Sequence, residues 1–232
     1  MKDSVKFKKI EKRLEEEKNK MASLLPSYLS NGFKKYAYSA GGAIYSLYHN
    51  EEPNDFDFFI SNKKFAKSLF DYFDIFLEIN KYGEKRIDSG KLLVGFYRKK
   101  KLLMTRNAIT LGKYQIVLKD VGEPKDVVSQ FDFKHNMFWY RDKEVKTLTN
   151  WDFLEDNHLR FNQERARDIC GTIIRVRKFL NRGFNISNSE MSKMLLKLNE
   201  EGFNDEELKK LKNSVKLSEE EKLEYSNESD WY

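Results

Sequence analysis

The sequence has little cysteine and lacks any long apolar run. A single cysteine, Cys170, excludes an internal disulfide framework and fits a reducing compartment. No stretch of about 18 apolar residues occurs, which argues against a membrane-spanning segment. The charged start, from Lys2 onward, also lacks the apolar region of a secretory signal. These absences predict a cytoplasmic protein without a membrane partner.

The aromatic and charged residues are abundant instead. Aromatic residues make up 14% of the 232 residues, which excludes a wholly disordered chain because Phe and Tyr drive collapse. The 43 basic and 37 acidic residues give a net charge of +6. A basic balance suits a polyanionic partner such as nucleic acid or a nucleotide. The alternative is that an AT-rich gene produces a Lys-rich protein without selection for binding.

Apolar patterning divides the chain into three parts. Residues 1–32 form a charged segment with loosely helical spacing, punctuated by Pro26 and Asn31-Gly32. Residues 33–148 alternate short apolar runs with helices, and residues 149–232 are mainly helical. The predicted class is α+β, a mixed β-sheet domain followed by a small helical carboxyl-terminal part. The expected strands are 36–39, 56–60, 92–97, 102–105, 108–111, 114–118 and 131–140; the expected helices are 43–49, 65–73, a short one opened by Glu123-Pro124, 161–180, 191–198, a short one capped by Asn204 or Asp205, and one starting at 218–221.

One constellation carries chemistry. Ser39-Ala40-Gly41-Gly42 is followed, after twelve intervening residues, by Asp55-Phe56-Asp57-Phe58. A strand, a glycine pair and a helix start allow the backbone to approach a phosphate closely. Two aspartates two positions apart on a strand share one face, while the phenylalanines point into the core. Two carboxylates facing a triphosphate suit Mg²⁺, which prefers oxygen ligands and substrate phosphates. The bland alternative for the acidic pair is a solvated strand end.

This pattern resembles the nucleotidyltransferase superfamily typified by DNA polymerase β. Within it, the chain is most similar to the template-independent branch of tRNA nucleotidyltransferases and poly(A) polymerases, in which an R-D-F-T-I-N-A stretch follows. Here 131–137 read F-D-F-K-H-N-M, without the preceding arginines. Residues 33–200 also resemble small nucleotidyltransferase-like proteins of tailed bacteriophages, through 107–110, 114–117, 131–135 and 174–184. A phage origin places the expected site of action in the host cytoplasm.

The resemblance implies a metal-dependent enzyme that moves a nucleoside monophosphate from an NTP to a hydroxyl acceptor, with an RNA 3′ end such as that of tRNA favoured. Asp55 and Asp57 are then the catalytic residues and the ligands of Mg²⁺ or Mn²⁺. The residues expected to bind the nucleotide are Ser39, Gly41, Gly42, Asn107, Asp132, Arg175 and Lys178. A protein side chain or a small molecule stays open as the acceptor.

The sequence departs from the superfamily pattern at the third carboxylate. Its expected position, on the strand 114–118, holds Gln115, which carries no charge to neutralise Mg²⁺; Asp120 and Asp132 are possible replacements. An inactive module that binds nucleic acid or a partner protein is therefore the alternative function. Equally open is whether the basic residues of 165–182 contact a nucleotide or form a solvated face. No zinc-type spacing, P-loop or Rossmann fingerprint occurs.

Overall fold

The computed structural model describes residues 4–81, 102–165, 168–209 and 211–212. The chain divides into two compact units. Unit 1 comprises Met1–Ser129 and His135–Leu154, and unit 2 comprises Gln130–Lys134 and Glu155–Tyr232. This division differs from the three-part prediction, because the amino-terminal segment is part of unit 1 and the boundary near residue 149 moves to Leu154.

Unit 1 is built on a seven-stranded mixed sheet, ordered β3-β4-β5-β2-β1-β6-β7. β2 pairs parallel with β5, and the other described pairs run antiparallel. The predicted α+β class with a mixed sheet is confirmed. The strands are β1 (Ala37–Ala40), β2 (Phe56–Ile60), β3 (Leu102–Met104), β4 (Ala108–Leu111), β5 (Tyr114–Val117), β6 (Phe138–Arg141) and β7 (Glu144–Thr147).

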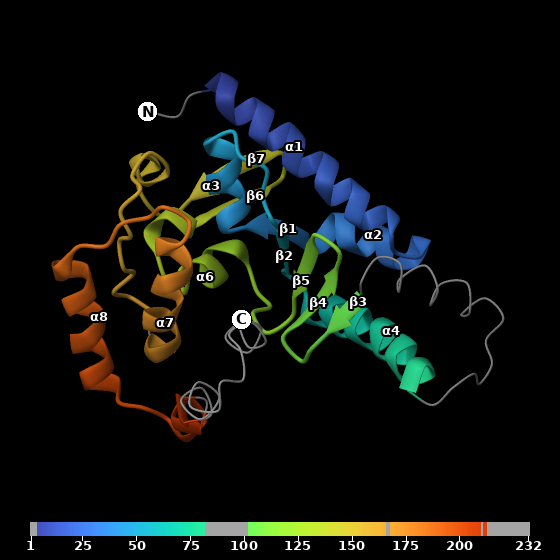
Figure 1. Cartoon of the computed structure of the whole chain (residues 1–232). Helices are drawn as coiled ribbons and strands as arrows, with labels where there is room; N and C mark the ends of the chain where they lie inside the picture. The colour runs from blue at the N-terminus through green and yellow to red at the C-terminus, as the bar shows by residue number, and fades with distance from the viewer. Residues whose placement is uncertain (1–3, 82–101, 166–167, 210, 213–232) are drawn as a thin grey trace. The chain divides into compact units, whose positions relative to one another are not determined.

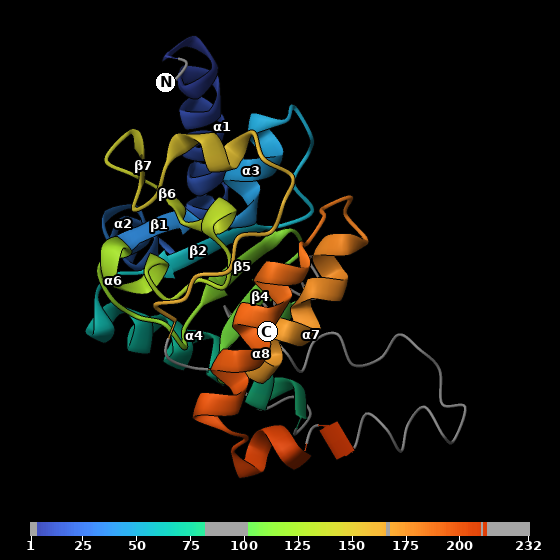
Figure 2. The same cartoon turned by 90° about the vertical axis from the view of Figure 1, so that its left-hand side faces the viewer.

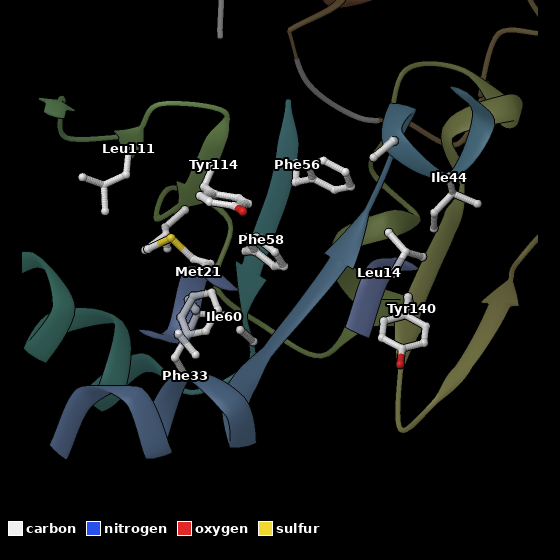
Figure 3. Close-up of a cluster of buried hydrophobic side chains, with 14 of the residues drawn as sticks. Leu14, Met21, Phe33, Ile44, Phe56, Phe58, Ile60, Leu111, Tyr114 and Tyr140 are labelled. Carbon is white, nitrogen blue, oxygen red and sulfur yellow. The ribbon is translucent and has the colours of Figure 1, made fainter. Parts of the chain in front are cut away.

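Helices supply the rest of unit 1 (Figure 1). They are α1 (Ser4–Ser23), α2 (Ser27–Tyr36), α3 (Gly42–Tyr48), α4 (Lys63–Lys81), α6 (Pro124–Val128) and the 3-10 turn η2 (Trp151–Leu154), with the 3-10 turn η1 (Lys134–Asn136) at the unit boundary. Figure 3 shows the core, in which Phe33 of α2 lies against Phe58 of β2 with ring centroids 5.2 Å apart. None of the helices in the described part of the chain is long and apolar enough to cross a membrane.

The first helix is a core element rather than a solvated extension. Four of its apolar residues, Phe7, Ile10, Leu14 and Met21, are at most 3% exposed. Burial of this many large side chains stabilises the attachment by several kcal/mol, since each contributes about 1.5–3 kcal/mol. α1 contacts α2, α3, β1 and the edge strand β7, so it packs across the sheet as far as its β7 edge.

Several expected boundaries are wrong. Asn31-Gly32 does not interrupt the chain: both lie inside α2, where a Cβ on Gly32 would meet the Phe65 ring at 2.3 Å. Residues 131–140 form a strand only from Phe138, and the following strand β7 was not expected. The helix expected over 161–180 begins at Ile169. The expected strand 92–97 and the helix starting at 218–221 lie outside the described residues.

Unit 2 contains α7 (Ile169–Leu180) and α8 (Asn188–Glu201), which pack against each other (Figure 2). Gly202 ends α8, as expected. Asn204 caps the helical residues 205–209 that follow: its Oδ1 accepts the Glu207 amide, and the Glu207 carboxylate accepts the Asn204 amide, both at 2.9 Å. The apolar core of unit 2 joins Phe133 to Phe161 through a β-bridge and to Phe179 at 5.1 Å between rings.

Candidate functional site

The glycine pair and the acidic pair lie at the same end of two neighbouring strands. β1 pairs antiparallel with β2, with Ser39 opposite Phe58. Because the strands run in opposite directions, the residues after Ser39 lie beside the residues before Phe58. Gly41 and Gly42 are therefore neighbours of the segment that carries Asp55 and Asp57, as the sequence pattern requires.

The two glycines differ in their backbone. Gly41 has φ +89° and ψ −145°, a conformation that is open to glycine and strained for other residues. Its amide donates to the Phe138 carbonyl at 3.1 Å, which fixes the end of β1 to β6. A Cβ built on Gly42 meets nothing within 4 Å. The backbone at Gly42 therefore faces open space that a ligand can approach.

The two aspartates lie at the start of β2. Phe56 and Phe58 are fully buried, whereas Asp57 between them is half-buried and points to the other face of the sheet. Asp55 directly precedes the strand and is exposed, and the alternation places it on the same face as Asp57. Gln115 of β5 is the register partner of Asp57. The neighbouring strand thus holds an amide where a third carboxylate was expected.

These residues fit a hard cation. Within the described ranges, no group of three or more His, Cys, Asp and Glu side chains could hold a metal by itself. Two carboxylates beside the open space at Gly42 nevertheless suit Mg²⁺, which keeps several waters and is completed by substrate phosphates. The donor set is compatible with a metal that arrives with a nucleotide and incompatible with a closed structural site.

The side chain of Ser39 does not lie with this group, which argues against the prediction that it binds the nucleotide. Its register partners are Phe58 and Tyr140, so its side chain is on the core face, opposite to Asp57. The residue is 1% exposed, and its Oγ has no hydrogen-bond partner in the part of the chain that the structure describes. A side chain enclosed by the core cannot contact a triphosphate on the other face.

Asn107 lies at the opposite end of the sheet. It precedes Ala108, whose register partner Val117 is beside Phe59 at the end of β2. Its carbonyl accepts the Leu118 amide at 2.7 Å and the Lys119 amide at 3.1 Å. The length of β2, roughly 15 Å at about 3.3 Å per residue, separates it from Asp55. Asn107 therefore shapes the turn before β4 and does not join the acidic pair.

The other three expected nucleotide ligands belong to unit 2. Asp132 and Arg175 bind each other: the carboxylate accepts Arg175 Nε at 2.6 Å and Nη2 at 3.0 Å. Arg165 Nε lies 3.0 Å from the same carboxylate, and Thr172 Oγ1 donates to it at 2.9 Å. Lys178 is half-buried on α7, one turn beyond Arg175.

This ionic cluster determines the charge of its members. Burial raises the pKa of Asp132, but the Arg175 and Arg165 guanidinium groups outweigh burial, so the pKa lies below its ordinary value. The pKa of Arg175 is raised because the carboxylates of Asp132 and Asp168 outweigh the effect of burial. The basic residues 165 and 175 are thus internal partners of Asp132 rather than a solvated face.

One buried carboxylate was missed by the sequence reasoning. Glu17 of α1 is fully buried and binds Lys20, Lys113, Arg13 and the Tyr114 hydroxyl. In the sequence it lies in a run of charges, so only its position among the apolar residues of α1 distinguishes it. The backbone carbonyl of its neighbour Lys113 accepts a hydrogen bond at 2.8 Å from the amide of Phe56, the residue between the two aspartates.

Comparison with known structures finds partial similarity to CCA-adding enzymes. The Thermotoga maritima CCA-adding enzyme complexed with tRNA_CCA aligns with a TM-score of 0.44 and 14% identity, over 79% of this chain and 45% of that chain. The Bacillus stearothermophilus CCA-adding enzyme in complex with CTP aligns with a TM-score of 0.45 and 15% identity, over 75% of this chain and 42% of that chain.

Comparison of sequences gives the family. The model of the Gabija anti-defense 2 family protein matches residues 15–160, and the chain belongs to this family. "Gabija anti-defense 2" of Bacillus phage SPbetaL7 is 30% identical over 184 residues, which are 78% of this chain. The chain spans 42% of the length of that relative.

Proposed function

We propose that the chain is a metal-dependent nucleotidyltransferase that acts in phage anti-defence against Gabija. The observation that carries the reaction class is the convergence of the glycine pair with Asp55 and Asp57 at one end of β1 and β2. The anti-defence role is supported by membership of the Gabija anti-defense 2 family and by the name of the phage relative.

In the proposed mechanism, the NTP lies against the open backbone at Gly42, and Asp55 and Asp57 hold its metal. When bound, Mg²⁺ neutralises the triphosphate and lowers the pKa of the attacking hydroxyl. The acceptor hydroxyl releases its proton to solvent water, its oxygen forms a bond to the α-phosphorus while the bond to the bridging oxygen breaks, and pyrophosphate leaves with the electron pair. The acceptor that we favour is an RNA 3′ end, such as that of tRNA; a protein or small-molecule hydroxyl is the alternative.

The alternative function is an inactive module that binds nucleic acid or a partner protein. The observation that favours it is Gln115, the register partner of Asp57, which supplies no negative charge to the site. An Asp57→Asn variant separates the two functions. A nucleotidyltransferase loses both label transfer and anti-defence in this variant, whereas a binding module shows no label transfer even as wild type and keeps its anti-defence activity in the variant.

The first test is label transfer. Wild-type protein is incubated with each α-labelled NTP, Mg²⁺ or Mn²⁺, and RNA or protein from cells that carry Gabija. We expect Asp55→Asn and Asp57→Asn to reduce transfer at least 100-fold, because the metal's carboxylate ligands are halved. Asp71→Asn is the matched control: its carboxylate pairs with Lys67 on the exposed face of α4, and its loss should leave transfer unchanged.

The second test is phage infection. Cells that carry Gabija and express the wild-type chain should support plaque formation by a Gabija-sensitive phage, and cells that express Asp57→Asn should not. If both proteins support plaque formation equally and no NTP gives label transfer, the chain acts as a binding module and not as an enzyme. Failure of the wild-type chain to restore plaques would remove the anti-defence role.

A further inference from the structure

The start of β2 is tied to α1 through a buried ionic network. Oε1 of Glu17 accepts a hydrogen bond from Lys20 Nζ at 2.8 Å and forms an ion pair with Arg13, whose Nε lies 3.2 Å away. Its Oε2 receives the Tyr114 hydroxyl at 2.7 Å and Lys113 Nζ at 2.9 Å. Three cationic side chains and one tyrosine hydroxyl therefore converge on a carboxylate that has no exposed surface. A buried charge is retained at this cost in desolvation only where such partners compensate it.

Two of these cationic side chains, Arg13 and Lys113, also contact the segment 50–57, which carries Asp55 and Asp57. Arg13 Nη2 binds Glu52 Oε1 at 2.6 Å, and Lys113 Nζ lies 3.7 Å from the same oxygen. Glu52 is in the loop between α3 and β2, three residues before Asp55. Lys113 also places its Nζ 5.0 Å from the Phe56 ring, and its carbonyl accepts the Phe56 amide. Partners of Glu17 thus contact this segment at Glu52, before the two aspartates, and at Phe56, between them.

We propose that Glu17 is a positioning residue for the metal ligands: through Lys113 and Arg13 it fixes residues 50–57 so that Asp55 and Asp57 are presented together. This role rests on the proposed function of the site. Glu17 itself is buried beneath the strand and contacts no substrate. Groups that orient metal ligands in this way typically change metal affinity by about 10–100-fold when they are removed.

The same helix offers a matched control. Glu15 also accepts a hydrogen bond from a tyrosine hydroxyl of the sheet, that of Tyr140 at 2.8 Å, but Tyr140 lies on β6. Glu15→Gln therefore perturbs α1 and one tyrosine contact without touching Lys113 or Glu52. Lys113→Met is a second probe of the network, because the lysine side chain is 38% exposed and its removal leaves the carbonyl contact to Phe56 in place.

The experiment compares the full chain as wild type, Glu17→Gln, Lys113→Met and Glu15→Gln. Amide hydrogen exchange of residues 50–57 is measured without ligand, and Mn²⁺ affinity is measured by calorimetry in the presence of a non-hydrolysable ATP analogue. We expect Glu17→Gln and Lys113→Met to speed exchange in 50–57 and to weaken Mn²⁺ binding about tenfold. Glu15→Gln should change neither reading.

The possible outcomes separate the positioning role from simpler effects. Unchanged exchange in 50–57, or faster exchange with Mn²⁺ affinity within about twofold of wild type, overturns the positioning role. Equal weakening by Glu15→Gln makes the effect one of general stability and also overturns it. If Glu17→Gln does not fold, the same two measurements on Lys113→Met support or overturn the role. If the wild type itself binds no Mn²⁺ in the presence of the analogue, the proposed function is overturned. This result comes from the wild type alone and does not depend on the variants.

Discussion

At the scale of single residues, Gly41 and Gly42 have separate roles that alanine can distinguish. Gly41→Ala forces a Cβ into φ +89° and should lower the free energy of unfolding by about 1–2 kcal/mol. Gly42→Ala meets no atom within 4 Å at the start of α3, so stability should stay the same or rise by up to about 1 kcal/mol. Urea denaturation measures both changes.

The same pair tests the nucleotide site. The new methyl group of Gly42→Ala fills the space that the proposed triphosphate approaches, so ATP affinity should fall while the fold is retained. Calorimetric titration with ATP and Mn²⁺ provides the measurement. If the Gly42→Ala protein is stable and binds ATP as tightly as the wild type, the triphosphate does not bind against the backbone at Gly42.

The order of the elements around the glycine pair could be predicted from the sequence, whereas the faces and positions set by strand pairing could not. The strand, glycine pair, helix and second strand are contiguous, so their order could be predicted. The face that Ser39 occupies depends on its alignment with Phe58, which a one-residue change in register would invert. The position of Asn107 depends likewise on where β4 joins the sheet.

At the scale of elements, the attachment of α1 depends on pH through Glu17. Burial raises the pKa of this carboxyl, but hydrogen bonds from Lys20, Tyr114 and Lys113 outweigh burial and lower it from 4.5 to about 2. Because the folded pKa is below the unfolded one, the carboxylate stabilises the fold above about pH 4.5 and this stabilisation is lost as the pH falls toward 2.

Comparison with a neutral variant isolates this effect. Between pH 6 and pH 3 the wild type should lose about 2 kcal/mol of unfolding free energy that Glu17→Gln does not lose, since the other carboxyl groups are common to both proteins. Denaturant titrations over this pH range supply the values. Parallel pH curves for the two proteins would show that Glu17 titrates normally and that its network contributes little.

The helical pattern of α1 could be predicted, but its burial could not. The apolar positions Ile10, Leu14 and Met21 indicate a helix with one apolar stripe. Glu17 is buried on the same side of the helix, where its carboxylate accepts a hydrogen bond from the hydroxyl of Tyr114, 97 residues later. A contact between such distant segments leaves no local pattern, which is why the segment 1–32 looked like a separate charged extension.

At the scale of the whole molecule, the Asp132 carboxylate connects two segments of unit 2 that are distant in the sequence. Asp132 joins the short segment Gln130–Lys134 to α7 through Arg175 and Thr172. Asp132→Asn removes the more buried of the two carboxylates that Arg165 and Arg175 share and leaves them the more exposed Asp168, so it should destabilise unit 2 by about 3 kcal/mol. Hydrogen exchange of α7 and α8 should accelerate accordingly, while that of the central strands of unit 1 should not.

An exposed ion pair in the same unit is the control. Glu201→Gln removes the partner of Lys197 on the solvent side of α8, and its cost should stay below about 1 kcal/mol. Similar small losses for both variants would mean that Arg165 and Arg175 find water or other acceptors when Asp132 is neutral. From the sequence alone these arginines fit a nucleotide contact or a solvated face, because the partner aspartate lies 43 residues before Arg175.

The interrupted path of the chain through the two units has a consequence for protein synthesis. β1 lies between β2 and β6, and β6 follows the excursion of Gln130–Lys134 into unit 2. On the ribosome, β1 therefore waits as an open sheet edge until residues 138–141 have emerged, and open apolar edges recruit other chains. A fragment that stops at Ser129 keeps both aspartates and both glycines yet lacks β6 and retains this edge permanently, so it should aggregate, whereas a nascent chain becomes protected once residues 138–141 have left the exit tunnel.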